Sequence, residues 1–445
     1  MCVSAVSSRP PCLCVRACAC LYVVCASSVL TELTKMGNAW DGHGGMTTFN
    51  VRDGYEEAWI RGYRSGFITH QEYQQLMDYK PSSDKDGNKL NDIKLNLQET
   101  DYGPFLADYT GHLDSQVLKR KMQEKVAAEF YYLRCIASPP LAKFLDYIAC
   151  KYMIENVITI LSSQGGDMET LLEDRCHPLG RFDDSVLRSL MNCENSAEGI
   201  EEVYSLVLVD TPIGPYFAKL VEALGGGDLK TLLRETSTNI VEELLHRFYL
   251  EDFHRYCLSL GGETAVVMGD ILEQCADHRS IQIVYNSVVG GSSVLSQPRH
   301  HADRAMLFPA FGKLYPMLLE QKHEPSRRIG FYPIQTLAEL KHSLSHFPDF
   351  KRLANSDVME GRPDERSNLA TLLFEQEVCK AELAFEGQFH YGMFYGYFRL
   401  KEQEIKNVEY IANMTQLGAP EEMKAGVIPI FYEEQPWRTG IFDEF

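Results

Sequence analysis

Two long runs of apolar residues at three- and four-residue spacing constrain the fold of this chain more than any other feature. The first covers residues 241–260 and stops at Gly261 and Gly262, where glycine commonly ends a helix. The second covers residues 372–414 without a proline. This spacing places the apolar side chains on one face of a helix. Because no comparably long alternating pattern is present, we predict an all-α fold, and we assign the short apolar stretch 206–209 to a helix as well.

Three parts of the chain repeat the same order of features, which predicts internal repetition. Each begins with a short amphipathic segment, a turn and an aromatic residue, at 93–105, 203–217 and 337–350, and two long helical runs follow. The second run of each pair contains a leucine and, seven positions later, a polar residue: Leu145 and Tyr152, Leu272 and Arg279, Leu400 and Asn407. We therefore expect three related sub-bundles, at about 46–165, 166–290 and 300–431.

Composition restricts the class of partner. The formal charge of −19 on 445 residues repels phosphate backbones, and no basic patch offsets it, so nucleic acid is not an expected partner. Six of the 13 cysteines lie in the first 25 residues, and the other seven are scattered singly without zinc-like spacing. That usage is typical of reduced cytosolic proteins.

The N-terminal segment supports two interpretations. Residues 17–30 are apolar and follow Arg9 and Arg16, as in the hydrophobic part of a signal peptide. The stretch is shorter than the roughly 20 apolar residues that span a bilayer, and no later stretch is long enough either. We expect residues 1–45 to be an extension outside the fold and residues 432–445 to be a C-terminal tail. The alternative is a secreted protein, for which glycosylation at Asn413 would be a marker.

The sequence contains no recognisable motif for nucleotide or nucleophilic chemistry. The triple glycine at 225–227 lacks the lysine of a phosphate-binding loop, and there is no G-x-G-x-x-G or G-x-S-x-G. We therefore predict no cofactor and no catalytic residue.

Metal and acid–base sites are weakly indicated. Adjacent donors at His300, His301 and Asp303 lie in an expected loop, and His342 and His346 share a helix face without a third ligand. The acidic pairs Glu375/Glu377 and Glu402/Glu404 lie near lysines, which is typical of a solvated helix face with local ion pairs. We predict no metal site, and a carboxylate- or histidine-dependent enzyme remains the less favoured alternative.

Gly392 and Gly396 interrupt a strongly aromatic helical run. Glycine in a helix interior costs about 1 kcal/mol relative to alanine, so a pair on one face predicts close approach of another backbone. Charged neighbours such as Arg399 and Glu402 favour tight packing in a soluble bundle over a membrane dimer.

Many short stretches, in order, resemble the subunit d family of V-type proton ATPases. The similarity covers about residues 46–431, and Met46 would be a natural start. The N-terminal stretches are Phe49-Asn50-Val51, Gly54-Tyr55, Arg61-Gly62-Tyr63-Arg64-Ser65-Gly66, Thr100-Asp101-Tyr102-Gly103, Cys176-His177-Pro178-Leu179-Gly180 and Leu208-Val209-Asp210-Thr211-Pro212. The C-terminal stretches are Tyr249-Leu250-Glu251-Asp252-Phe253, Leu260-Gly261-Gly262, Leu314-Tyr315-Pro316, Gln388-Phe389-His390-Tyr391 and Arg399-Leu400-Lys401-Glu402-Gln403-Glu404-Ile405.

The resemblance implies a funnel of three helical bundles that lies on the cytosolic face of vacuolar or endosomal membranes. Its implied partners are the proteolipid c-ring, the central stalk subunits and the membrane a subunit, with peripheral membrane association through those partners. The implied role is non-catalytic: the subunit joins the ATP-driven shaft to the ring so that both turn together. A helical scaffold unrelated to proton pumping is the alternative.

Residues within the matching stretches, together with Arg279 in the partly retained stretch 276–279, are candidates for structural or assembly roles. Departures from the family pattern occur at the expected loops 81–91 and 290–299, around 275–287 and in 415–427. The candidates are Tyr55, Arg61, Asp101, Tyr102, His177, Asp210, Glu251, Arg279, Tyr315, His390, Glu402 and Glu404.

Overall fold

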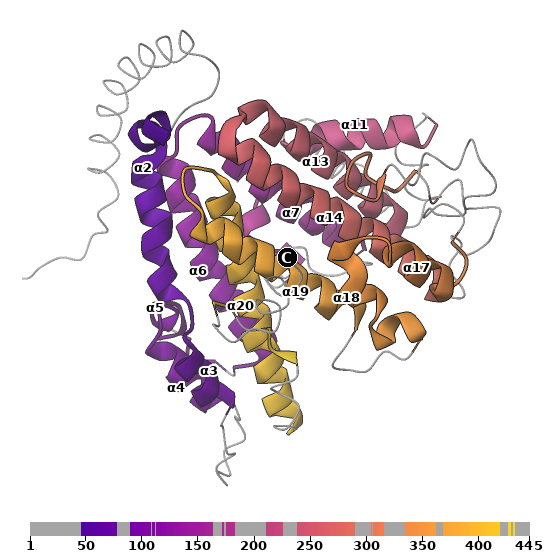
Figure 1. Ribbon diagram of the computed structural model, residues 1–445. Coiled ribbons are helices and arrows are strands. Elements are labelled where there is room, and N and C mark those ends of the chain that lie inside the picture. Colours follow the sequence, from indigo (N-terminus) through magenta and orange to yellow (C-terminus); the bar gives the residue numbers. More distant parts are fainter. Residues whose placement is uncertain are drawn as a thin grey trace, which may run out of the picture.

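The computed structural model shows helices and connecting turns in the part of the chain that it describes, and it assigns no strand there (Figure 1). The prediction of an all-α fold is confirmed for these residues. The apolar stretch 206–209, Asp210 and the donors at 300–303 lie outside them. The described residues are 46–77, 90–107, 109–111, 113–162, 171–172, 175–182, 211–225, 238–289, 304, 306–315, 334–361, 368–418, 426–428 and 430–431.

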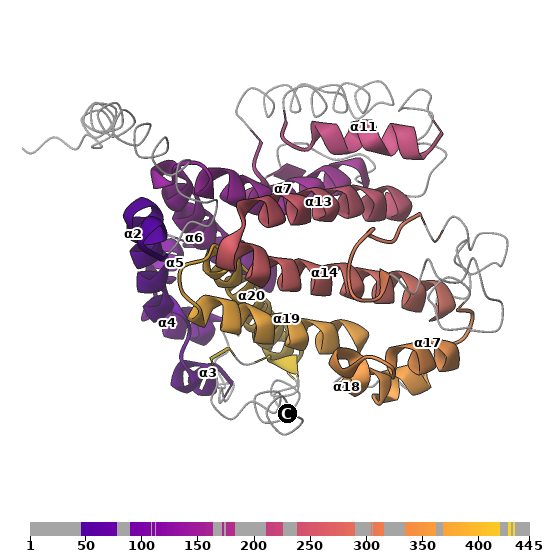
Figure 2. The same ribbon diagram turned by 45° about the horizontal axis from the view of Figure 1, so that its top comes forward.

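Six long helices form three hairpins and pack in a closed order. α6 packs on α7, α7 on α13, α13 on α14, α14 on α19, α19 on α20, and α20 returns to α6 (Figure 2). Their buried apolar faces form one continuous core. Residues distant in sequence therefore become neighbours around α20. The helices are α6 Ser115–Ile136, α7 Leu141–Ser162, α13 Thr238–Leu260, α14 Gly262–Val289, α19 Leu369–Glu386 and α20 Gly392–Leu417.

Shorter helices cover the outside of this arrangement. α2 lies along α6 and α20, α11 packs on α13, α17 packs on α14, and η2 fits between α6 and α7. Their bounds are α2 Met46–Gly62, η1 Tyr63–Gly66, α3 His70–Met77, α4 Asn91–Gln98, α5 Gly103–Ala107, η2 Pro178–Gly180, α11 Gly214–Ala223, α17 Leu337–Leu344, η6 Pro348–Phe350, α18 Lys351–Ala354 and η7 Asp357–Glu360. No described helix combines the length and the apolar character needed to cross a bilayer.

The ends of the helices follow local sequence signals. α13 ends at Leu260, and Gly261 and Gly262 then adopt positive φ angles of 69° and 56°, as the glycine pair predicted. The Asn368 side chain accepts a hydrogen bond from the Thr371 N–H at the start of α19. Gly418 ends α20 in the left-handed region.

The run 372–414 is not one helix, because it turns back on itself between α19 and α20. Phe389 adopts a φ of 65° in this turn. Arg61 of α2 binds the carbonyl oxygens of Phe385 and Gly387 and so satisfies acceptors at the end of α19. The apolar period alone did not reveal this break, because the turn contains the aromatic residues Phe389 and Tyr391 instead of a proline.

The predicted close approach of another backbone is confirmed at Gly396, whereas the nearest neighbours of Gly392 are side chains. A Cβ atom on Gly396 would lie 2.6 Å from the Ala381 carbonyl oxygen of α19, and one on Gly392 would lie 2.8 Å from Val267 Cγ1. The α19–α20 crossing therefore depends on the missing side chain at Gly396.

Candidate functional site: buried polar networks and an exposed groove

Glu404 lies at the centre of a fully buried polar network. Its carboxylate accepts hydrogen bonds from Lys401 Nζ (2.7 Å), the Tyr102 hydroxyl (2.6 Å) and the Ile68 N–H (2.7 Å). Lys401 also donates to the Gly66 carbonyl at 2.6 Å. Burial lowers the pKa of Lys401, although the Glu404 carboxylate opposes that shift. The network fixes the segment after α2 against α20.

Glu402 belongs to a second network on another side of α20. It accepts from Lys151 of α7 at 3.2 Å, from the Tyr152 hydroxyl at 3.1 Å and from Arg399. Arg399 also pairs with Glu377 of α19. Burial alone would raise the pKa of Glu402, but Arg399 and Lys151 outweigh it and hold that pKa well below its usual range. These ion pairs connect α7, α19 and α20.

His177 joins this region through an aromatic stack. Its ring lies on that of Tyr152 with centroids 4.3 Å apart, and its Nδ1 accepts from the Leu179 N–H. The Asn156 side chain donates to the carbonyls of His177 and Gly180 at 2.9 Å. Burial lowers the pKa of His177 to about 3, so the ring is neutral in the folded protein.

Arg61 and His390 meet at the turn between α19 and α20. Beyond its two carbonyl contacts, Arg61 forms an ion pair with Glu57 at 3.0 Å. The buried His390 ring lies against Gly387, where a Cβ would collide with it. Burial, and then the Arg61 charge, lower the pKa of His390 to about 4. Both residues therefore support the turn.

The remaining candidates lie apart. Glu251 of α13 pairs with Arg247 at 2.8 Å and accepts from the Ala310 N–H. Arg279 of α14 pairs with Glu243 of α13 at 2.7 Å. Tyr315 is half-buried at the end of a described loop. We find no arrangement that brings these three to one site.

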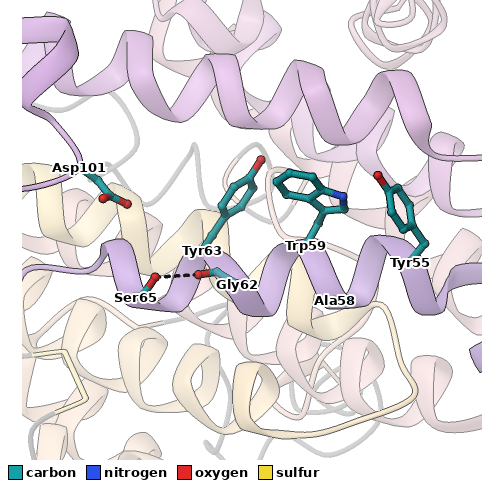
Figure 3. Close-up of a pocket in the computed structure, with 7 residues that line it drawn as sticks. All are labelled: Tyr55, Ala58, Trp59, Gly62, Tyr63, Ser65 and Asp101. Atoms are coloured by element: carbon teal, nitrogen blue, oxygen red, sulfur yellow. Dashed lines mark hydrogen bonds between the residues drawn. The ribbon is translucent and has the colours of Figure 1, made fainter. Parts of the chain in front are cut away.

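Tyr55 and Asp101 line an open groove of about 450 Å³ beside α2 (Figure 3). Tyr55, Trp59 and Tyr63 point the same way from successive turns of α2 and η1, toward the neighbouring helix. Trp59 contacts Tyr132 of α6 with ring centroids 4.9 Å apart. Ala58, Gly62 and Ser65 complete the lining.

The prediction of a solvated charged face was wrong for the acidic pair at 402 and 404. Glu404 and Lys401 are fully buried, and Glu402 is mostly buried. Periodicity could have indicated this, because Lys401 and Glu404 fall at positions in phase with the buried Phe394, Tyr397 and Phe398. Sequence reasoning also missed three fixed polar residues, Lys151, Asn156 and Arg304, and it placed Glu377 on a solvated face although Arg399 pairs with it. Arg304 is buried and donates to Ser287 Oγ at 2.7 Å and to the Ile334 carbonyl at 2.9 Å.

No group of three His, Cys, Asp or Glu side chains in the described part of the chain could hold a metal ion. His342 and His346 do share a face of the helical segment, with rings 4.8 Å apart, and both are exposed.

Comparison with known proteins identifies the family. Residues 57–426 match the family described as ATP synthase (C/AC39) subunit. The chain belongs to this family. It is 33% identical over 390 residues to V-type proton ATPase subunit d of Dictyostelium discoideum, which covers 87% of this chain and 98% of the relative. It is 33% identical over 386 residues to V-type proton ATPase subunit d2 of Arabidopsis thaliana, and the match covers 86% of this chain and 98% of the relative. The V-type proton ATPase subunit d of Saccharomyces cerevisiae is 31% identical over 370 residues, and the match covers 82% of this chain and 93% of the relative.

The family match spans both buried networks and the groove, apart from Tyr55. It includes Trp59, Asp101, His177 and the 399–405 stretch of α20, all of which lie between residues 57 and 426. The resemblance to subunit d of V-type proton ATPases is confirmed.

Proposed function

We propose that this chain is the coupling subunit of a V-type proton ATPase and performs no catalysis itself. The observation that carries the proposal is the match to subunit d relatives over more than four-fifths of the chain. In this role the chain would lie on the cytosolic face of a vacuolar or endosomal membrane. It would join the central stalk to the proteolipid c-ring, with the membrane a subunit as a further neighbour.

Stiffness of the helical body supports a torque-bearing role. The Glu402 and Glu404 networks tie α20 to α7, to α19 and to the segment after α2 through buried, charge-assisted hydrogen bonds. A part that transmits rotation must resist local opening, and large packed interfaces with satisfied polar groups provide that resistance.

One end of the helical body is suited to contact partners. The turns of the three hairpins meet there: the Tyr256 hydroxyl donates to the Pro140 carbonyl at 2.8 Å, and the Tyr391 N–H donates to Thr264 Oγ1 at 3.1 Å. Exposed apolar side chains accompany the turns, with Leu258 at 51% and Val266 at 67% exposure. We call this region the hairpin-turn end.

Depletion with rescue tests the function. Vesicles from cells lacking the chain should lose ATP-driven acidification, measured with a pH-sensitive dye, and re-expression of the full chain should restore it. The Glu99→Gln variant, altered at an exposed residue, should restore it equally. Full acidification without the chain would contradict the proposal and favour an unrelated helical scaffold.

Cross-linking tests the partners. In the assembled complex, a cysteine replacing Val266 should cross-link to a proteolipid or central stalk subunit. The matched control replaces Leu95, which is 59% exposed on α4, away from the hairpin-turn end. Equal cross-linking from both positions, or none from Val266, would overturn the assignment of this end to the rotor.

A further inference from the structure

The groove beside α2 has the composition of a cation-binding surface. Its floor is aromatic, since Tyr55, Trp59 and Tyr63 lie in edge or tilted contacts with centroids 6.0 and 6.3 Å apart. The faces of such rings attract cations. Tyr55 is 60% exposed and Trp59 is 37% exposed, so these rings are accessible in the described structure.

The end of the groove at Asp101 is acidic. The Asp101 side chain is 54% exposed and lies 3.9 Å from Lys125 Nζ. Lys125 is itself held by Glu129 at 2.7 Å. Two carboxylates thus face one ammonium, which leaves this end with an excess negative charge that an incoming cation would balance.

The position of Asp101 is built by its surroundings. It packs against Gly66, where a Cβ would collide with the carboxylate, so the backbone after α2 makes room for it. Three of the stretches that carry the family resemblance supply lining residues. Tyr55 comes from 54–55, Gly62, Tyr63 and Ser65 come from 61–66, and Asp101 comes from 100–103.

We propose that this groove binds an arginine side chain carried on an extended segment of a partner protein. A planar guanidinium stacks on aromatic faces and pairs with a carboxylate through two parallel hydrogen bonds, which a lysine ammonium does not do. From Tyr55 to Tyr63 the helix rises about 12 Å, the length of about four extended residues. This inference goes beyond the coupling role and does not depend on it.

A fluorescence titration tests the proposal on the full chain. Trp40→Phe and Trp437→Phe leave Trp59 as the single tryptophan reporter, because the chain has three. The probe is the tetrapeptide acetyl-Ala-Leu-Ala-Arg-amide. The control peptide carries citrulline in place of arginine, which keeps the shape and removes the charge. The arginine peptide should change the Trp59 emission in a saturable way, and the citrulline peptide should bind about fivefold more weakly.

Variants on both sides of the groove complete the test. Asp101→Asn removes the carboxylate partner of the guanidinium and should weaken binding of the arginine peptide about fivefold. Tyr55→Ala, at the opposite end of the groove, removes an aromatic contact with the residues that precede the arginine and should weaken binding by a similar factor, whereas Glu99→Gln should not change it. Tyr55 is largely exposed, so Tyr55→Ala should keep the native fold. The Tyr55→Ala variant therefore still tests the proposal if circular dichroism shows that Asp101→Asn is poorly folded. Equal binding of the two peptides, no saturable response, or no loss in Tyr55→Ala would overturn the proposal.

Discussion

Lys401 and Glu404 lie one turn apart on α20, and both side chains are fully buried at a separation of 2.7 Å. Each charge is acceptable in the core because the other, together with Tyr102, Ile68 and Gly66, satisfies its hydrogen bonds. Removing one partner leaves a buried charge without compensation, whereas replacing both with apolar groups does not.

Glu404→Ala should therefore lower the free energy of unfolding by about 3–5 kcal/mol, measured by urea denaturation followed by circular dichroism. The double variant Lys401→Met/Glu404→Leu should lose less unfolding free energy than Glu404→Ala, because it leaves no unpaired charge in the core. The control Glu409→Ala, also on α20, breaks a partly exposed ion pair with Lys119 of α6 and should cost about 1 kcal/mol or less. Similar losses for Glu404→Ala and Glu409→Ala would show that the buried network is not structurally important.

His177 should contribute to acid sensitivity. Burial lowers its pKa from 6.5 to about 3, so the neutral ring stabilises the fold above about pH 6.5. That contribution is lost as the pH falls from 6.5 toward 3, because the unfolded chain binds the proton first.

His177→Asn removes the titration and keeps a side-chain acceptor for the Leu179 N–H. Between pH 7 and pH 5, the unfolding free energy of this variant should fall by about 2 kcal/mol less than that of the parent chain. His342→Gln, at an exposed ring, should follow the parent. If parent and His177→Asn lose the same stability on acidification, the assignment of a buried neutral ring is wrong.

At the scale of elements, the α19–α20 hairpin depends on backbone contact at Gly396. Gly396→Ala should destabilise the protein by about 1–3 kcal/mol, because the new Cβ would lie 2.6 Å from the Ala381 carbonyl oxygen. The matched control is Gly269→Ala within α14, whose Cβ would lie 3.7 Å from Leu258 Cδ2. There the better helix former should stabilise by about 0.4–1 kcal/mol. Thermal unfolding of both variants measures the difference, and a stabilising Gly396→Ala would refute the close crossing.

At the scale of the whole molecule, α2 closes the outside of the helical body. Phe49 and Ile60 of α2 are buried, and Arg52 and Asp53 both contact the Tyr391 hydroxyl. Removal of α2 therefore exposes both core and polar contacts.

Two truncations test the expectation that residues 1–45 lie outside the fold. A chain that begins at Met46 should keep the unfolding free energy of the full chain. A chain that begins at His70 should lose at least about 3 kcal/mol, since burial of each large apolar side chain contributes about 1.5–3 kcal/mol. Denaturant titration distinguishes them, and a marked loss on removing only residues 1–45 would show that the extension belongs to the fold.

Local patterns were sufficient to predict helices, their glycine ends and one close contact. The period through 241–260 and the pair Gly261-Gly262 predicted α13 and its end, because periodicity and left-handed caps are properties of neighbouring residues. The three-bundle funnel and its boundaries stay a prediction. The repeat pattern predicted two helical runs after 337–350, but the apolar period did not locate the turn between them, because Arg61, 324 residues from its acceptor Phe385, helps to stabilise it.

By itself the sequence determined the all-α class, the family and the close approach at Gly396, since these depend on local spacing and on residue identity. Tertiary structure decided which charges are buried and which surface residues meet. Glu402 and Glu404 look alike in sequence, yet α20 directs them into separate networks. Tyr55 and Asp101 share a groove only because the chain folds back after α2. Burial and contact depend on elements distant in sequence, so no local pattern contains them.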